Sequence, residues 1–288
     1  MFWKRRTYLD YAAGASGNPS SPHAEGRAAK GMLEDARREI ARLAEVKPDD
    51  VIFTSGATEA NAIAILGIAK PGDHIFYMPG AHASIVENIK LLATRGTDVE
   101  MLPIKGGRVD TESLKQMIRP KTRLIAMEAV CGETGTTWNT REVAHSLQEF
   151  FARSGQGSHS QKIPAGRALL HVDASQAPLT EKISRAHFSA DVLTFDSAKV
   201  GGPRGVGCLI AHRTITWIAQ RKRSAGACKG IRRGAPCRGA RPRGVSCARS
   251  SAARATHCCS YKHFASVYKR GTRRRAAHSQ RLARRARH

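Results

Sequence analysis

The sequence lacks three features that would each point to a particular class of protein. No apolar run reaches the roughly 18 residues that a membrane-spanning helix requires. The basic start, MFWKRRTYLDYAAG, has no apolar core of the kind found in a secretory signal. The seven cysteines show no CxxC or CxxH spacing, which argues against a disulfide framework and against a zinc site. We therefore expect a cytoplasmic protein with no membrane partner.

Acidic residues are missing from the last third of the chain. All 23 of them lie at or before Asp196, and residues 1–196 carry 24 Lys and Arg, a net charge of +1. The other 24 of the 48 basic residues follow without compensation, so the net charge of +25 describes a basic tail on a nearly neutral body. The tail has neither interleaved aromatic residues nor a helical pattern, so specific nucleic-acid binding is not expected. Non-specific binding of polyanions through the tail is the alternative of a different functional class.

Residues 1–215 alternate between strand-like and helix-like segments. The spacing of apolar residues predicts a helix over 25–46, and a strand, a glycine-containing turn and a helix over 50–70. Thr111 is expected to cap a short helix that ends at Ile118. Further strands are expected at HIFYMP, VEMLPI, RLIAMEAV, ALLHVDASQ and DVLTFDSAK, further helices at ASIVENIKLLATRG and TREVAHSLQEFFARS, and a polar loop over 153–166. This alternation predicts an α/β fold with a largely parallel sheet.

Polar clusters follow several of the predicted strands. TSGATE, CGETGT, DASQ and DSAK each come directly after an apolar segment. In α/β proteins ligands bind outside the carboxyl ends of the strands, so we expect these clusters to form one site.

One lysine, Lys199, stands between two strand-like segments in LTFDSAKVGGPRGVGCLI. A lysine that leaves a strand beside glycines is expected to be partly buried, which favours the neutral amine that forms Schiff bases. Asp173 ends its strand and is suited to pair with the protonated ring nitrogen of a pyridoxal-type cofactor, and Gln176 to bind a phenolic oxygen. Taken singly, however, such a lysine is usually a solvated surface residue, and such an aspartate is usually a turn or cap residue.

Two further segments suit the same cofactor. SGATE lies at a strand-to-helix turn, where backbone N–H groups near Ala57 and the hydroxyl of Thr58 are able to bind a phosphate. His82 follows the next strand and can stack on an aromatic ring. The alternatives are an ordinary helix cap at Thr58 and a structural histidine. Cys131 and Cys208 flank apolar strands and are interpreted as small buried hydrophobic residues.

The ordered series of motifs resembles the cysteine desulfurases of the NifS/IscS type, in the class V aminotransferase family of pyridoxal-phosphate enzymes. The similarity runs through YLDYAAG, GNPSSPHAEGRAA, DVIFTSGATEANAIAI, GAHASIVEN, ETGT, HVDASQ and SAKVGGPRGVG, over about residues 7–212. It implies the three-layer large domain of the aspartate aminotransferase type, with a mostly parallel sheet around pyridoxal 5'-phosphate. Residues 1–215 would form this domain, and residues 216–288 a basic tail of low order.

The resemblance also implies the roles of individual residues. Lys199 would carry the cofactor as a Schiff base, and Asp173 would pair with the pyridine nitrogen. Gln176 would contact the ring hydroxyl, and His82 would stack on the ring as a second catalytic residue. The phosphate would be held by Ala57, Thr58 and Ser197.

Several positions depart from the family pattern. About twenty residues that usually separate YLDYAA from GNPSS are reduced to a Gly-Ala-Ser linker. The usual Asn-Asn pair is Cys131-Gly132, and the residue before the lysine is Ala198 instead of histidine. After about Gln220 only GIRRGAP is loosely similar to the family's glycine-rich segment, and no setting like SGSAC surrounds a cysteine. An acid-free tail rich in Arg, Gly, Ala, Ser and Cys is typical of out-of-frame translation, so we interpret it as a small domain that is missing or has been replaced by a frameshift.

The function that the resemblance implies is the conversion of L-cysteine to L-alanine, with the sulfur passed to an enzyme cysteine as a persulfide and then to an acceptor protein for iron–sulfur cluster assembly. The family also implies a homodimer. The sequence does not assign the persulfide cysteine. The alternative within the family is an aminotransferase, lyase or epimerase that acts on a small amino acid.

Overall fold

A computed structural model describes residues 9–10, 17–153, 167–215 and 217. Most of the YLDYAAG motif, the predicted polar loop and nearly all of the basic tail, with GIRRGAP, lie outside the described residues.

The described chain is built around a seven-stranded sheet with the order β1-β9-β8-β7-β6-β2-β3. Neighbouring strands are parallel from β3 to β8, whereas β9 is antiparallel to both β8 and β1. The prediction of a mostly parallel sheet is therefore confirmed. The strands are β1 (Val51–Thr54), β2 (His74–Tyr77), β3 (Asp98–Met101), β6 (Thr122–Glu128), β7 (Leu169–Asp173), β8 (Val192–Asp196) and β9 (Gly207–Ala211).

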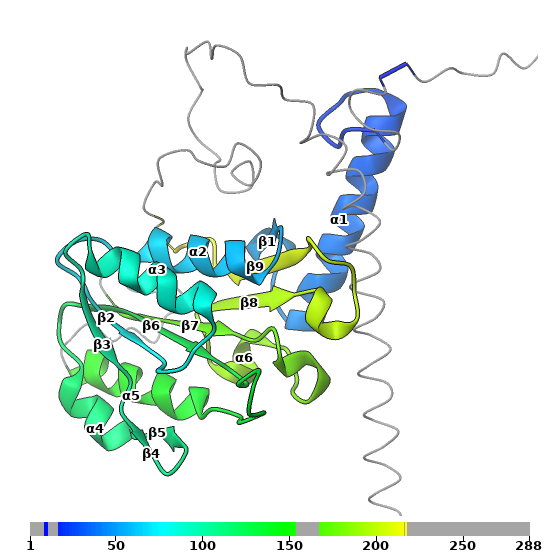
Figure 1. Cartoon of the computed structure of the whole chain (residues 1–288). Helices are drawn as coiled ribbons and strands as arrows, with labels where there is room; N and C mark the ends of the chain where they lie inside the picture. The colour runs from blue at the N-terminus through cyan, green and yellow to red at the C-terminus, as the bar shows by residue number, and fades with distance from the viewer. Residues whose placement is uncertain (1–8, 11–16, 154–166, 216, 218–288) are drawn as a thin grey trace, which may run out of the picture.

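Helices cover both faces of this sheet, with α2 and α3 on one side and α4, α5 and α6 on the other (Figure 1). This arrangement gives the three layers that the family resemblance implies. The elements outside the sheet are α1 (Ala24–Ala44), η2 (Pro48–Asp50), α2 (Ala57–Ile68), α3 (Ala83–Ala93), the hairpin β4 (Ile104–Lys105) and β5 (Arg108–Val109), α4 (Thr111–Met117), α5 (Thr140–Arg153), η3 (Ala177–Leu179), α6 (Arg185–Phe188) and η4 (Ala198–Val200).

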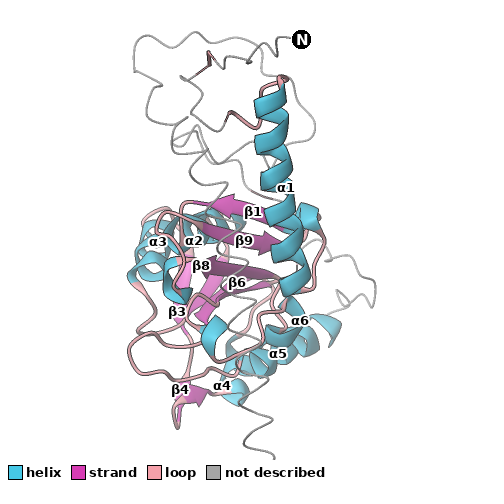
Figure 2. Cartoon of the chain, turned by 90° about the vertical axis from the view of Figure 1, so that its right-hand side faces the viewer, coloured by secondary structure: helices cyan, strands magenta, loops and turns pink. Residues whose placement is uncertain are grey.

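The first helix, α1, follows the predicted apolar spacing. Ala36, Ile40 and Ala44 are buried at helical intervals, and the His23 side chain accepts a hydrogen bond from the backbone N–H of Gly26. Figure 2 shows α1 standing beside the edge of the sheet formed by β1 and β9, with its N-terminal half extending beyond the strands. The helix therefore packs on the sheet with only its C-terminal part.

One local prediction is wrong, and one pair of strands was not predicted. The short helix α4 is capped by Asp110 and not by Thr111, because the Asp110 carboxylate accepts from the N–H groups of Glu112 and Ser113. The hairpin of β4 and β5 was not predicted from the sequence. Its turn, Gly106-Gly107, has φ angles of 58° and 74°, which glycine adopts without steric cost.

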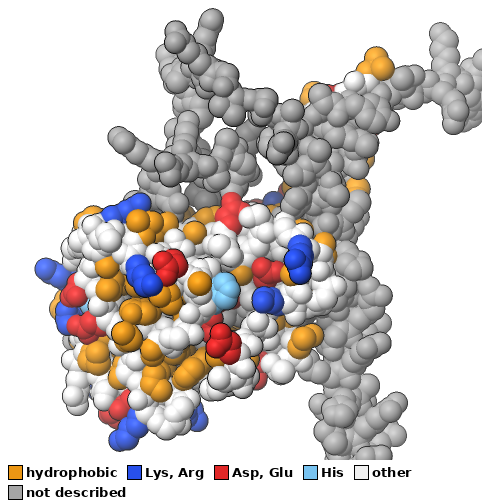
Figure 3. Space-filling model, in the orientation of Figure 1, with side chains coloured by type: hydrophobic (Ala, Val, Ile, Leu, Met, Phe, Trp, Pro, Cys, Tyr) orange, Lys and Arg blue, Asp and Glu red, His pale blue; other side chains and the backbone are white. Residues whose placement is uncertain are grey.

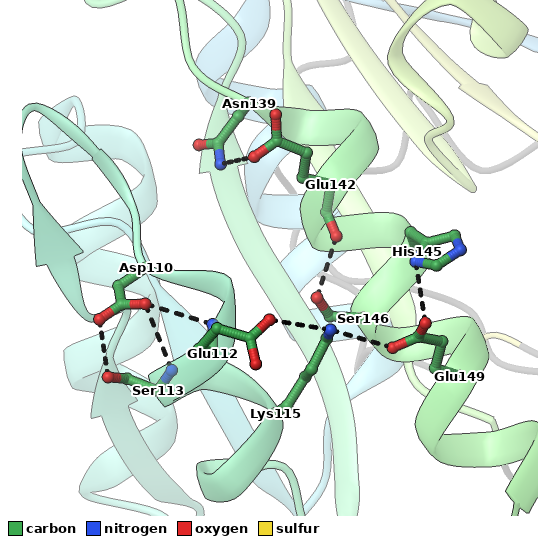
Figure 4. A network of polar contacts seen from close by, with 9 residues as sticks. All are labelled: Asp110, Glu112, Ser113, Lys115, Asn139, Glu142, His145, Ser146 and Glu149. Carbon is green, nitrogen blue, oxygen red and sulfur yellow. Dashed lines mark hydrogen bonds and ion pairs between the residues drawn. The ribbon is translucent and has the colours of Figure 1, made fainter.

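The helices α4 and α5 are joined by a polar network (Figure 4). The Lys115 ammonium lies 3.0 Å from a Glu112 oxygen on its own helix and 3.1 Å from a Glu149 oxygen on α5. The Asn139 amide donates to Glu142 at 2.7 Å and to the backbone of Val109 at 3.1 Å. These contacts fix the outer helical layer at the end of the sheet away from β1.

The central strands form the core. All five residues of β7 and of β9 are buried, as expected for strands covered on both faces. Apolar side chains also gather on the face of the molecule on which α3 lies (Figure 3). Two large apolar side chains of this part of the chain are exposed, Leu91 on α3 by 39% and Met101 at the end of β3 by 58%. Within the described residues no helix combines the length and the apolarity that a membrane crossing requires.

Candidate active site

The predicted site lies at the carboxyl ends of the parallel strands. β6, β7 and β8 are neighbours in the sheet and end at Glu128, Asp173 and Asp196. The turn after β1 leads into α2, and the segment after β2 leads into α3 at His82. The strand ends therefore bring together most of the polar clusters that the sequence singled out.

Asp173 is the buried acid at the centre of this edge, with 6% of its surface exposed. One carboxylate oxygen accepts a hydrogen bond of 2.6 Å from the side-chain amide of Asn61 on α2. The other oxygen accepts a hydrogen bond of 2.9 Å from the backbone N–H of Ser175. Uncharged donors thus hold the carboxylate in place on two sides.

His82 is linked to Asp173 through two further side chains. The Asn61 amide also donates to Ser84 Oγ at 2.8 Å, and Ser84 Oγ lies 2.8 Å from His82 Nδ1. The backbone N–H of Ser84 donates to the same ring nitrogen at 3.2 Å. Because Nδ1 accepts these bonds, we assign the ring proton to Nε2. His82 is also the N-cap of α3, so the structural interpretation of this residue holds whatever it binds.

Glu128 closes this network from β6. Its Oε1 accepts a hydrogen bond of 2.8 Å from the backbone N–H of His82. Glu128 and Asp173 are register partners in parallel strands, so their side chains leave the sheet on the same face. Burial raises the pKa of Glu128, and the negative charges of Asp173 and Glu133 raise it further, while the hydrogen bond from His82 opposes the shift.

Gln176 lies over the segment that replaces the family's Asn-Asn pair. A Cβ atom placed on Gly132 would lie 2.9 Å from Gln176 Nε2. The lack of a side chain at Gly132 therefore leaves the room that the Gln176 amide occupies. The CGETGT and DASQ clusters, which contain these two residues, therefore lie side by side.

A carboxylate of the protein itself occupies the predicted phosphate site at the start of α2. Asp196 Oδ2 accepts a hydrogen bond of 3.1 Å from the backbone N–H of Ala57. Thr58 is exposed in the next position. Ser197 is fully buried, its Oγ has no hydrogen-bond partner among the described residues, and a Cβ on Gly202 would lie 2.1 Å from it. The Ser197 hydroxyl therefore faces the glycine turn that follows it.

Lys199 lies in η4, immediately after β8, and its side chain is exposed. The expectation that it is partly buried is wrong for the described chain, because η4 buries only Val200 and leaves Ala198 and Lys199 exposed. Within the described residues Lys199 has neither an ion-pair nor a hydrogen-bond partner. The described residues therefore leave the Lys199 amine without a bound partner.

The two described cysteines have different chemistry. Cys208 in β9 is completely buried, and burial together with the charge of Asp196 raises the pKa of its thiol to about 12. Cys131 is half-buried, and hydrogen bonds from the side chain and backbone of Thr134 and from the backbone of Glu133 lower its pKa. The interpretation as a small buried hydrophobic residue is confirmed for Cys208 and is wrong for Cys131, which is only half-buried.

The ring-binding part of the site fits a pyridoxal-type cofactor. The buried carboxylate of Asp173 is suited to a protonated ring nitrogen. Near it, Asn61 Oδ1 and Ser175 Oγ are buried and have no partners among the described residues. Sequence reasoning found Asp173 but missed Asn61, Glu128 and Asp196. Their positions could have indicated a role in the site, since Asn61 ends the SGATEAN segment and the two acids lie at the ends of predicted strands.

Known proteins are similar to this chain over most of its length. A family model described as aminotransferase class-V matches residues 6–228. A protein of Archaeoglobus fulgidus named cysteine desulfurase IscS 1 is 32% identical over 237 residues, covering 78% of this chain and 56% of that protein. A NifS/IcsS protein homolog of Lactobacillus delbrueckii is 35% identical over 214 residues, covering 72% of this chain and 51% of that protein. The chain thus spans about half the length of the curated relatives it matches.

Solved structures show the same fold. A NifS-like protein superposes with a TM-score of 0.68 at 23% identity, covering 91% of this chain and 65% of that chain. The DndA protein of Streptomyces lividans superposes with a TM-score of 0.63 at 26% identity, covering 88% of this chain and 66% of that chain. A structure of SspA in complex with cysteine gives a TM-score of 0.64 at 24% identity, with coverages of 88% and 67%.

Proposed function

The chain belongs to the class V aminotransferase family, and from this membership we propose that it is a pyridoxal-phosphate-dependent enzyme of the cysteine desulfurase type. Its substrate would be L-cysteine, its product L-alanine, and the sulfur would pass to a cysteine thiol. The observation that carries the proposal is the buried Asp173 carboxylate at the strand ends, connected through Asn61 and Ser84 to His82.

The residues of the site have separate tasks in this proposal. When bound, pyridoxal phosphate supplies an aldehyde that reacts with amines and a ring that acts as an electron sink. Asp173 holds a proton on the ring nitrogen, because its buried carboxylate stabilises a cation beside it. Lys199 offers an exposed amine for covalent attachment and for proton transfer. His82 offers a flat ring with its proton on Nε2, and Gln176 an amide for the ring hydroxyl.

The acceptor of the sulfur is not assigned by these residues. Of the described cysteines, Cys208 is unsuited because its buried thiol resists ionisation. Cys131 has the lower pKa, and the remaining cysteines lie outside the described residues. We also propose a cofactor domain over residues 1–215 followed by a tail over 216–288. From the family we further propose a homodimer, a sulfur-acceptor protein as partner and a cytoplasmic location.

An absorbance titration tests attachment of the cofactor. The wild-type chain with pyridoxal phosphate should show a visible band that borohydride abolishes, and Lys199→Ala should lack it. Lys90→Ala provides a matched control, because Lys90 is an exposed lysine on α3 that pairs with Glu87 at 2.8 Å. A folded wild-type chain without the band, or a Lys199→Ala chain that keeps it, contradicts the proposal.

Product analysis tests the reaction itself. Incubation with L-cysteine should yield alanine and sulfide in the presence of a reducing thiol. A keto acid from L-cysteine, or turnover of another small amino acid in its place, would identify a different class V activity. The same assay repeated with Asp173→Asn should show a large loss of activity, because an amide does not stabilise a positive charge on the ring nitrogen.

A further inference from the structure

The N-terminus of α2 is capped by a carboxylate from a distant part of the chain. Gly56 occupies the N-cap position and has no side chain with which to accept a hydrogen bond. Asp196, at the end of β8, supplies the acceptor instead, since its Oδ2 lies 3.1 Å from the backbone nitrogen of Ala57. Its Oδ1 accepts a second hydrogen bond of 2.8 Å from the backbone N–H of Ala198.

Close backbone packing fixes this carboxylate in position. A Cβ atom on Gly56 would lie only 3.2 Å from Asp196 Oδ2. A Cβ atom on Gly207 would lie 2.6 Å from the Gly56 Cα, and Gly207 is the register partner of Asp196 in the adjacent strand. The turn before α2, the start of β9 and the end of β8 therefore meet without intervening side chains. The contact between Asp196 and Ala57 is part of this packing and not a chance meeting of surface groups.

The position that Asp196 fills is the one that an anionic ligand would take. The start of a helix presents free N–H groups and a partial positive charge, which favours phosphate and carboxylate groups. A second acid binds the backbone of the same turn: Glu59 Oε2 accepts a hydrogen bond of 2.7 Å from the backbone N–H of Ser55. A phosphate that approaches Ala57 would meet a negative charge at hydrogen-bonding distance and would have to displace it.

We propose that Asp196 determines the ligand selectivity of this site by occupying the phosphate position at the start of α2. The site then recognises a pyridoxal-type ligand mainly through its ring and gains little from the phosphate. This inference rests on the proposed function, because it concerns the ligand of the same site. It assigns to Asp196 the role that an external anion would otherwise have at Ala57.

Binding of two ligands that lack the aldehyde tests the proposal without any covalent step. Pyridoxine 5'-phosphate and pyridoxine are titrated by calorimetry into the full chain and into Asp196→Ser. The dissociation constant of pyridoxine divided by that of pyridoxine 5'-phosphate measures how much the phosphate contributes to binding. We expect a ratio below about ten for the wild type, and at least a tenfold larger ratio for Asp196→Ser, because the vacated N–H of Ala57 becomes available to phosphate.

Two further variants separate this role from general effects of charge and folding. Asp196→Asn removes the charge at constant size and keeps one oxygen acceptor, so it should shift the ratio in the same direction even where the serine variant is unstable. Glu59→Gln removes a charge from the same turn without freeing Ala57, and should shift the ratio much less. A merely structural role of Asp196 would weaken the binding of both ligands equally.

The outcomes distinguish this inference from the proposed function. If both ligands bind and the Asp196 variants leave the ratio unchanged, or if the wild type already prefers the phosphorylated ligand by a large factor, the inference on Asp196 is wrong and the proposed function stands. If neither ligand binds to the wild type or to any variant, the proposed function fails, and the inference fails with it.

Discussion

Protonation of a single buried histidine should destabilise the protein in mild acid. His171 lies in β7, two residues before Asp173, and is completely buried. Its Nε2 lies 3.1 Å from Thr194 Oγ1 on the neighbouring strand, and its Nδ1 has no hydrogen-bond partner within the described chain. A second ring proton would therefore be placed in the core without an acceptor. Burial lowers the pKa of His171 to about 4, although the charge of Asp173 acts in the opposite direction.

The size of the effect follows from linkage between protonation and folding. Between the unfolded value of 6.5 and the folded value of about 4, the unfolded chain binds the proton more tightly, so the free energy of unfolding falls as the pH falls. At about 1.4 kcal/mol per pKa unit, the full loss is about 3 kcal/mol, of which about 2 kcal/mol is reached near pH 5. This is a substantial part of the stability of a typical domain.

Urea unfolding from about pH 7 down to about pH 5 measures this slope against two variants. His171→Phe keeps a buried ring but loses the bond to Thr194, so it should be about 1 kcal/mol less stable than the wild type near neutrality. In acid the order should reverse, because the phenylalanine does not titrate. Thr194→Val is the matched control, since it loses the same bond and keeps the histidine. Parallel slopes for wild type and His171→Phe would refute the reasoning.

Three other predictions test the packing and the titrating groups around the site. Gly207→Ala should lower the free energy of unfolding by about 1–3 kcal/mol, because its methyl group would overlap the backbone of the turn before α2. Gly31→Ala, on an open part of α1, should raise it by about 0.5–1 kcal/mol, and thermal melts compare the two variants. Glu128→Gln should flatten the pH dependence of the free energy of unfolding. Burial raises the pKa of Glu128, so the stability that its protonated form contributes is complete below the pKa of the unfolded chain and is lost as the pH rises through the pKa of the folded chain. Iodoacetamide followed by peptide mapping should label Cys131 well before Cys208, and faster labelling of Cys208 would contradict the two opposite pKa shifts.

The sequence predicted the elements of the fold well because most of them are encoded locally. The apolar spacing in α1 and the buried run in β6 each specify one kind of element, and both were identified close to their observed ends. The hairpin of β4 and β5 was missed because its strands are only two residues long. A two-residue strand is too short to show an alternating pattern.

The site was predicted less completely because its partners are non-local. Asp173 was identified from its place at a strand end, but the residue that holds it, Asn61, lies 112 positions away in the chain and inside a helix that reads as apolar. The pairing of Glu128 with Asp173 depends on the register of β6 against β7, which no local pattern gives. In the DSAK cluster the phosphate role was given to Ser197, whereas the carboxylate of Asp196 and not the serine hydroxyl reaches Ala57.

The negative charge at the strand ends gives a physical reason for the proposed preference for the ring over the phosphate. Three neighbouring strands end in Glu128, Asp173 and Asp196, and none of these acids forms an ion pair within the described residues. Each is stabilised instead by N–H groups, which reduce the cost of the charge but do not neutralise it. Three such acids make the edge favourable to a cation and unfavourable to a second anion. A protonated pyridine ring and the ammonium group of an amino acid satisfy this requirement, whereas a phosphate dianion opposes it. Under the proposed function, the strand-end carboxylates would therefore favour the ring and the amine, and the exposed Lys199, three residues after Asp196, would be a positive charge that favours a phosphate.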